Sequence, residues 1–209
     1  MAISQVLNRF IKKQFKLTTM NLGKGMIYLM IFSLVVISCK KEKFNTKNTD
    51  FQKAFNEKLD AGSESAITMD TEVHTYTFVL SEDKSLASIG YQSVEAIETA
   101  NYLIEIRDNS DSSLVYSEES TFKSNKMSYI TAGAPIVLQG GVSYSISRIQ
   151  TNWAGNITNT IGHLVKTSES DYPISYGILT ITESNFHDHG KNDTNLRYYA
   201  LPRIDMELK

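Results

Sequence analysis

The stretch Val142-Ser143-Tyr144-Ser145-Ile146-Ser147 alternates apolar and polar residues with a period of two. Successive side chains of a strand point to opposite faces of a sheet, so this pattern predicts a strand with one buried and one solvent-facing side. The same alternation recurs at 76–80, 102–107, 174–178 and 203–208. Short apolar segments predict further strands at 86–91, 114–116, 136–138 and 161–165.

Turn-forming residues separate these segments, as at 108–113 and 139–141. No helix-length amphipathic pattern interrupts residues 67–209, and the stretch 93–99 predicts a loop or one helical turn. Short strands without crossover helices predict an all-β fold, a single antiparallel β-sandwich of the Ig or jelly-roll type. A closed barrel is the alternative.

A short helix is predicted at residues 50–60, ahead of the strands. Phe51 and Phe55 fall on one helical face, and Thr49 with Gln52 matches a capping box. A helix of this length is not stable alone in water, so it either packs on the domain or frays.

Residues 26–37 are apolar apart from Ser33, follow several basic residues, and lead directly to Ser38 and Cys39. The run is shorter than the roughly 20 residues that span a bilayer, and it has the length of the apolar region of a signal peptide. A short transmembrane anchor followed by a chance cysteine is the alternative.

The sequence Val36-Ile37-Ser38-Cys39 resembles the lipobox of bacterial lipoproteins. The resemblance implies cleavage between Ser38 and Cys39, and a diacylglycerol and an N-acyl chain such as palmitate on Cys39. Two or three acyl chains give stable membrane anchoring where a single chain does not. The expected location is the bacterial cell envelope, lipid-anchored at the outer membrane, with the periplasmic or surface face left open.

The resemblance divides the chain into three segments. Residues 1–38 would be the signal peptide, 39–65 a lipidated tether that includes the short helix, and 66–209 the β-sandwich. Residues 1–19 are either a start-site artefact, with Met20 as the true start, or a long basic leader.

Removing residues 1–38 changes the charge of the chain. That segment has five Lys and Arg and no acidic residue, which leaves 16 basic and 23 acidic residues, a net charge of −7 against −2 for the whole sequence. An acidic surface argues against nucleic acid as a partner. Cys39 is the only cysteine, so the domain has no disulfide and no cysteine-based metal site.

A second resemblance concerns the strands. The segments 88–91, 102–108 and 135–147 resemble bacterial extracellular sandwich modules of unknown function, with a Gly-Tyr strand followed by two further patterned strands. The resemblance supports the sandwich and implies no active site.

A possible metal site lies at His187-Asp188-His189, because both imidazoles project to the same side of an extended chain. Two imidazoles and a carboxylate suit zinc or copper, with a further ligand from His74, His163 or Asp193. The alternative is a polar surface loop, which the neighbouring Gly, Asn and Asp residues favour.

A calcium site is a second hypothesis, at Asp108, Ser110 and Asp111, with Glu119 at the separation of an EF-hand ligand. Ser113 stands where that loop requires glycine, so a solvated hairpin turn is the favoured interpretation.

Trp153, the only tryptophan, lies between Asn152 and Asn156. An aromatic ring beside amides is typical of sugar-binding surfaces, whereas the alternative is a tryptophan that caps the sandwich. Tyr172, Tyr198 and Tyr199 are candidates for the same two roles.

No nucleophile elbow or Gly-rich phosphate loop occurs in the sequence, and Glu118 and Glu119 would point to opposite faces of a strand. We therefore expect a lipid-anchored envelope protein, not an enzyme, that binds a glycan or a protein partner and needs no cofactor beyond the covalent lipid. The alternatives are a structural subunit of an envelope complex, with a sheet edge as interface, and a metal-dependent enzyme.

Overall fold

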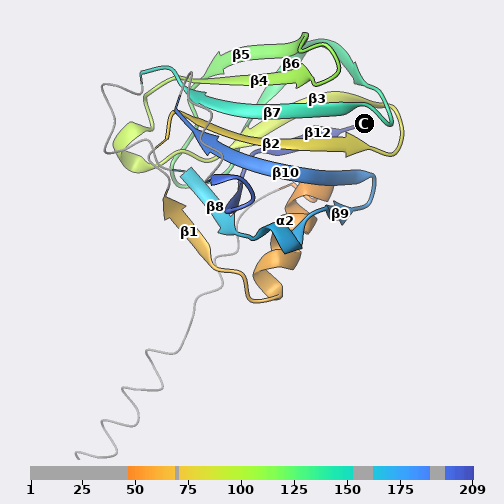
Figure 1. Cartoon of the computed structure of the whole chain (residues 1–209). Coiled ribbons are helices and arrows are strands. Elements are labelled where there is room, and N and C mark those ends of the chain that lie inside the picture. Colours follow the sequence, from red (N-terminus) through yellow and green to blue (C-terminus); the bar gives the residue numbers. More distant parts are fainter. Residues whose placement is uncertain (1–46, 69–70, 153–161, 189–195) are drawn as a thin grey trace, which may run out of the picture. The chain divides into compact units, whose positions relative to one another are not determined.

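The computed structural model describes residues 47–68, 71–152, 162–188 and 196–209 (Figure 1). Their strands are β1 (Ser65–Thr68), β2 (Val73–Leu80), β3 (Lys84–Tyr91), β4 (Tyr102–Asp108), β5 (Leu114–Ser120), β6 (Ser128–Leu138), β7 (Ser143–Gln150), β8 (Gly162–Lys166), β9 (Ile174–Tyr176), β10 (Leu179–His187), β11 (Ala200–Pro202) and β12 (Asp205–Leu208). Helix α2 covers Asp50–Asp60, and single 3₁₀ turns lie at Glu95–Ile97 and Glu169–Asp171.

The strands form antiparallel sheets that pack as a sandwich, which confirms the predicted all-β class. One sheet has the strand order β5-β4-β7-β2-β10-β9, and β12-β3-β6 form the second (Figure 1). A small third sheet, β1-β8-β11, extends from the first near β10. The alternation read from the sequence explains the core, because one side of β2, β4 and β7 is fully buried between the sheets.

Helix α2 is present as predicted, and it packs on the domain. Thr49 caps it by accepting a hydrogen bond from the Gln52 amide at 3.1 Å. The Phe51 and Phe55 rings are both 1% exposed, and Phe51 stacks on Tyr76 of β2 with ring centroids 5.3 Å apart. The helix therefore closes one open side of the sandwich, next to β9 and β12.

The chain passes over the edge of β12 just before this helix. Glu207 and Ser88 alternate with the core residues Met206 and Ile89, so their side chains leave the opposite face of that sheet. The Lys47 ammonium contacts Ser88 and Glu207 on that face, whereas Phe51, four residues later, is inside the core.

The prediction that one face of residues 203–208 is exposed to solvent is wrong at two positions. Arg203 is 1% exposed and Asp205 is fully buried. Arg203 donates to Gln52 of α2 and to Gln92, each at 3.3 Å, and its guanidinium lies 5.5 Å from the Phe55 ring centroid. The helix and its flanking residues cover this side of the last strand, and polar partners replace water there.

We predict that Phe55→Ala lowers the free energy of unfolding by about 3–5 kcal/mol, because it leaves a cavity between α2 and the sheets. Leu114→Ala is the control, since Leu114 is 50% exposed and its truncation should stay within about 0.5 kcal/mol. Urea denaturation of both variants measures the difference. Equal, small losses would show that α2 does not belong to the core.

Candidate functional site

His187 and Asp188, two of the proposed metal ligands, lie at the end of β10. The His187 Nδ1 atom is 3.1 Å from the Asp188 carbonyl oxygen. His189 and Asp193 lie outside the described residues. The zinc or copper site therefore stays a prediction.

The other two histidines have different surroundings. His74 is fully buried and packs edge-on against Phe186 at 4.7 Å, on the face of β10 opposite to His187. Burial and the nearby Arg203 guanidinium lower the pKa of His163 to about 4. Because His74 and His187 lie on opposite faces of the sheet, they cannot join in one site. No cluster of three His, Cys, Asp or Glu residues suited to a metal occurs in the described ranges.

The turn between β4 and β5 uses its carboxylates internally. Asp108 accepts hydrogen bonds from the Ser110 amide and hydroxyl at 2.8 and 2.7 Å, and Asp111 accepts from the Ser113 amide at 2.8 Å. Glu119 pairs with Leu103, five residues along β4 from Asp108. At about 3.3 Å per residue this places Glu119 too far from the turn to join it in one calcium loop.

Asn152 is exposed at the end of β7, while Trp153 and Asn156 lie outside the described residues. The neighbouring Thr151 hydroxyl donates to the Asn101 carbonyl at 3.0 Å. This contact places Asn152 beside the loop that follows β3, so the sugar-binding hypothesis keeps one described residue at this end of the sandwich.

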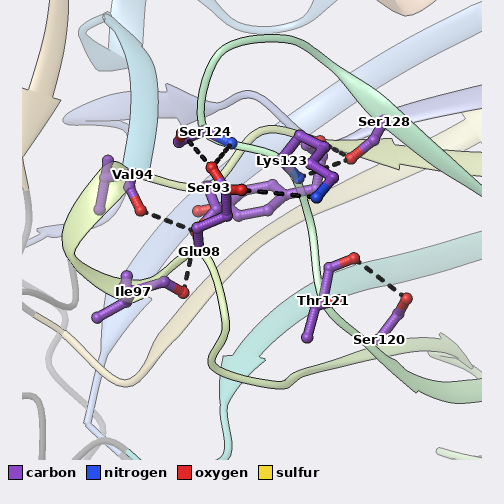
Figure 2. Close-up of polar contacts among 10 residues, drawn as sticks. Ser93, Val94, Ile97, Glu98, Ser120, Thr121, Lys123, Ser124 and Ser128 are labelled. Carbon is purple, nitrogen blue, oxygen red and sulfur yellow. Dashed lines mark hydrogen bonds and ion pairs between the residues drawn. The ribbon is translucent and has the colours of Figure 1, made fainter.

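That loop is fastened to the loop between β5 and β6 (Figure 2). The Glu98 carboxylate accepts hydrogen bonds from the Ser124 amide at 3.0 Å and from its hydroxyl, and it pairs with Lys123 at 3.6 Å. These bonds, the serine hydroxyl foremost, lower the pKa of Glu98. On the buried side of the loop, the Ser93 hydroxyl is hydrogen-bonded to the Tyr102 hydroxyl at 2.9 Å.

The three tyrosines proposed for sugar stacking differ in exposure. Tyr172 is tied down by its hydroxyl, 2.7 Å from Ser184 Oγ, and Tyr198 packs against it at 5.2 Å. Tyr198 has a left-handed backbone, with φ of 63°. Tyr199 is 43% exposed, so it alone of the three presents much of its ring to solvent.

Beneath the loops at the Asn152 end lies a buried arginine that the alternation pattern did not single out. Arg148 follows Tyr144 and Ile146 on the core face of β7 and is fully buried. Its guanidinium lies 5.4 Å from the Tyr102 ring centroid and 5.7 Å from that of Tyr91. Cation–π contacts of this kind stabilise a desolvated charge.

The N-terminal end of the described chain is bound to the sandwich by several polar contacts. The Lys47 amide donates to the Tyr129 hydroxyl at 3.3 Å, and the Lys47 ammonium lies 4.4 Å from the centroid of the same ring. The ammonium also donates to Ser88 Oγ at 3.0 Å and forms an ion pair with Glu207. These contacts fix the chain immediately before α2.

Asp205 is the centre of this junction. Its two carboxylate oxygens accept hydrogen bonds from the hydroxyls of Thr49 and Tyr129, each at 2.6 Å. Burial raises the pKa of Asp205, although both hydrogen bonds and the Arg203 charge oppose that rise. One buried carboxylate thus joins the helix cap, β6 and the last strand.

A cavity of about 410 Å³ lies beside this junction, within the range of volumes typical of ligand sites. Its walls come from the start of α2, the last strand and the turn between β9 and β10, and include Phe51, Ile178, Met206 and Leu208. Two lysines and three carboxylates also line it: Lys47, Lys84, Asp50, Glu82 and Glu207.

No sequence pattern pointed to this cavity, because its residues come from four separated segments. The glycine at position 177 was a weak signal, since glycine is favoured where the backbone is left-handed, and φ here is +55°. A Cβ there would lie 2.2 Å from a carboxylate oxygen of Asp50, the same oxygen that accepts a 3.1 Å hydrogen bond from the Ile178 amide. The glycine thus lets the turn meet the start of α2.

No protein-family model matches this chain, and a search of curated proteins found no significant match. Within the described residues, no helix has both the length and the apolar character needed to cross a membrane.

We predict that Thr49→Ala lowers the free energy of unfolding by about 1–3 kcal/mol, because it removes the helix cap and leaves one Asp205 oxygen without its donor. Thr49→Ser keeps the hydroxyl and is the matched control. Urea titrations of the two variants give the difference. Equal stability of the alanine and serine variants would contradict the role of the hydroxyl.

Asp205 should also make stability depend on pH. Because its folded pKa is raised above the unfolded value of about 3.9, the folded state binds the proton more tightly. The Asp205 contribution to the free energy of unfolding should therefore fall as pH rises from about 4 through the folded pKa.

Asp205→Asn removes this titration and serves as the reference. The stability of the wild type relative to Asp205→Asn, measured in urea between pH 4 and 7, should decline with rising pH. A difference that increases with pH would mean that the folded pKa is lowered.

Proposed function

We propose that this chain is a lipid-anchored protein of the bacterial cell envelope, whose β-sandwich binds a glycan or a protein partner and does not act as an enzyme. The observation that carries the proposal combines sequence and structure. The lipobox-like Val36-Ile37-Ser38-Cys39 lies just ahead of a domain whose described core begins at Phe51. A protein processed at Cys39 keeps every one of those core residues.

The length of the intervening chain supports anchoring. Seven residues lie between Cys39 and Lys47, where the chain is already bonded to β3, β6 and β12. The eight steps from Cys39 to Lys47 reach at most about 29 Å when the chain is fully extended. An anchor on Cys39 would therefore keep the sandwich close to the membrane surface.

Binding is supported by the surface of the sandwich. The cavity beside α2 has the size of a ligand site, and the Asn152 end is a loop cluster of the kind that carries binding residues on sandwich scaffolds. The alternative, a structural subunit of an envelope complex, is supported by the exposed side chains of Val137 and Leu114 on outer strands.

We predict that Cys39→Ser abolishes acylation and the accompanying change in mass, and that it releases the protein from the membrane fraction. A thiol is the only acceptor for the diacylglycerol, so serine cannot replace it. Mass spectrometry and fractionation of the wild type and the variant test this. Unchanged mass and membrane retention of Cys39→Ser would overturn the anchoring proposal.

Two binding assays separate the partner classes. A glycan array probed with the wild type and Trp153→Ala tests sugar stacking, since binding that survives the substitution would exclude Trp153 as the anchor. Recovery of one stable envelope protein by cross-linking, with no glycan signal, would favour a protein partner.

A further inference from the structure

We propose that the cavity beside α2 binds an extended peptide, which carries an aliphatic side chain and a lysine or arginine two residues away. The inference rests on the proposed binding function and deepens it, because it names a site and a peptide as the ligand. It does not depend on lipidation.

Strand β12 has an open edge beside the cavity. This strand is an outer strand of its sheet and pairs with β3 on one side only, among the residues that the structure describes. Thr49 covers the strand at Asp205, whereas Met206, Glu207 and Leu208 border the cavity. An extended chain placed there would add a strand to the sheet, a common mode of peptide recognition in which main-chain hydrogen bonds supply much of the affinity.

Part of the cavity lining is apolar. Leu179 and Met206 are nearly fully buried, and Ile178 and Leu208 are partly exposed beside them. Its one aromatic residue, Phe51, is 1% exposed and presents no ring face to a sugar. The partly exposed side chains of Ile178 and Leu208 suit the aliphatic side chain of a peptide better than a carbohydrate.

Charge also bears on the ligand. The cavity is lined by three carboxylates and two lysines. Lys47 pairs with Glu207, Lys84 with Glu82 at 2.9 Å, and Asp50 with Lys53 at 3.5 Å, so each carboxylate of the lining has a basic partner. The acidic chain that follows residue 38 provides the field that attracts cations. Side chains two residues apart in a strand share one face, so a basic residue at that spacing reaches the charged rim while the aliphatic one enters the cavity.

The test is a fluorescence anisotropy titration of the full chain in detergent micelles with the labelled peptide S-K-T-L-T-K-S. Two control peptides replace the leucine by serine or both lysines by glutamate. We expect saturable binding of the first peptide, at least about tenfold tighter than binding of either control. Absence of saturable binding, or equal affinity for the leucine and serine peptides, would overturn the proposal.

Protein variants then locate the site. Leu208→Trp fills the cavity and should weaken binding by about tenfold or more, whereas Leu114→Trp, on an outer strand that does not line the cavity, should leave it unchanged. Equal effects of the two substitutions would place the peptide elsewhere and contradict the proposal.

Glu82→Lys provides a second variant that does not threaten the fold, because the Glu82 side chain is 57% exposed. It should weaken binding of the lysine peptide and strengthen binding of the glutamate peptide, whereas Glu119→Lys should change neither affinity. No change with Glu82→Lys would refute the charge argument. Repeating the titration on Cys39→Ser, together with the mass of the wild-type protein, separates the two proposals. Peptide binding by a wild-type protein that carries no acyl chain would refute anchoring alone.

Discussion

The burial of Phe51 and Phe55 between two sheets is the contact on which the described domain depends. Two packed sheets leave an open side, and an eleven-residue helix has too few internal hydrogen bonds to persist in water without tertiary contacts. Each therefore needs the other. The helix gains its stability from the core, and the sheets gain a cover for Tyr76 and the residues around it.

Polar contacts decide where this helix sits. Thr49 at its start is bonded to Asp205, and Gln52 in its first turn is bonded to Arg203. Both partners belong to the last seven residues of the chain, so the beginning and the end of the domain are joined directly. Removing Asp205 or Arg203 from water is unfavourable, and the hydrogen bonds that each side chain makes offset part of that cost. The result is a specific position for α2 where apolar packing alone would permit sliding.

The sequence predicted the strands well, because alternation over 76–80, 102–107 and 142–147 reflects one buried face on each. It predicted the helix but not its role, since Phe51 and Phe55 show an apolar face without showing what covers it. It misplaced Arg203 and Asp205, which the period-two pattern assigns to solvent. Alternation reports which side of a strand faces the core. It carries no information on a second layer that covers the other side.

The candidate sites differ in the same way: a site formed by local contacts was recognisable from the sequence, and a site formed by distant segments was not. The turn at 108–113 was recognised because its bonds are local, as those of Asp108 to Ser110 show. The cavity beside α2 was not recognised, because Lys47, Glu82, Ile178 and Leu208 are brought together only by the complete fold. A lipid on Cys39 would place that cavity near the membrane, where an envelope partner would meet it.

Hydrogen–deuterium exchange of the full chain in detergent micelles tests the central claim, that α2 is part of the sandwich core, most directly. Amides of Phe55 and its neighbours in the last two turns of α2 should be protected nearly as strongly as those in the middle of β2, since both would open only with the whole domain. Exchange of these helix amides at the rate of a free peptide, while β2 stays protected, would contradict the account.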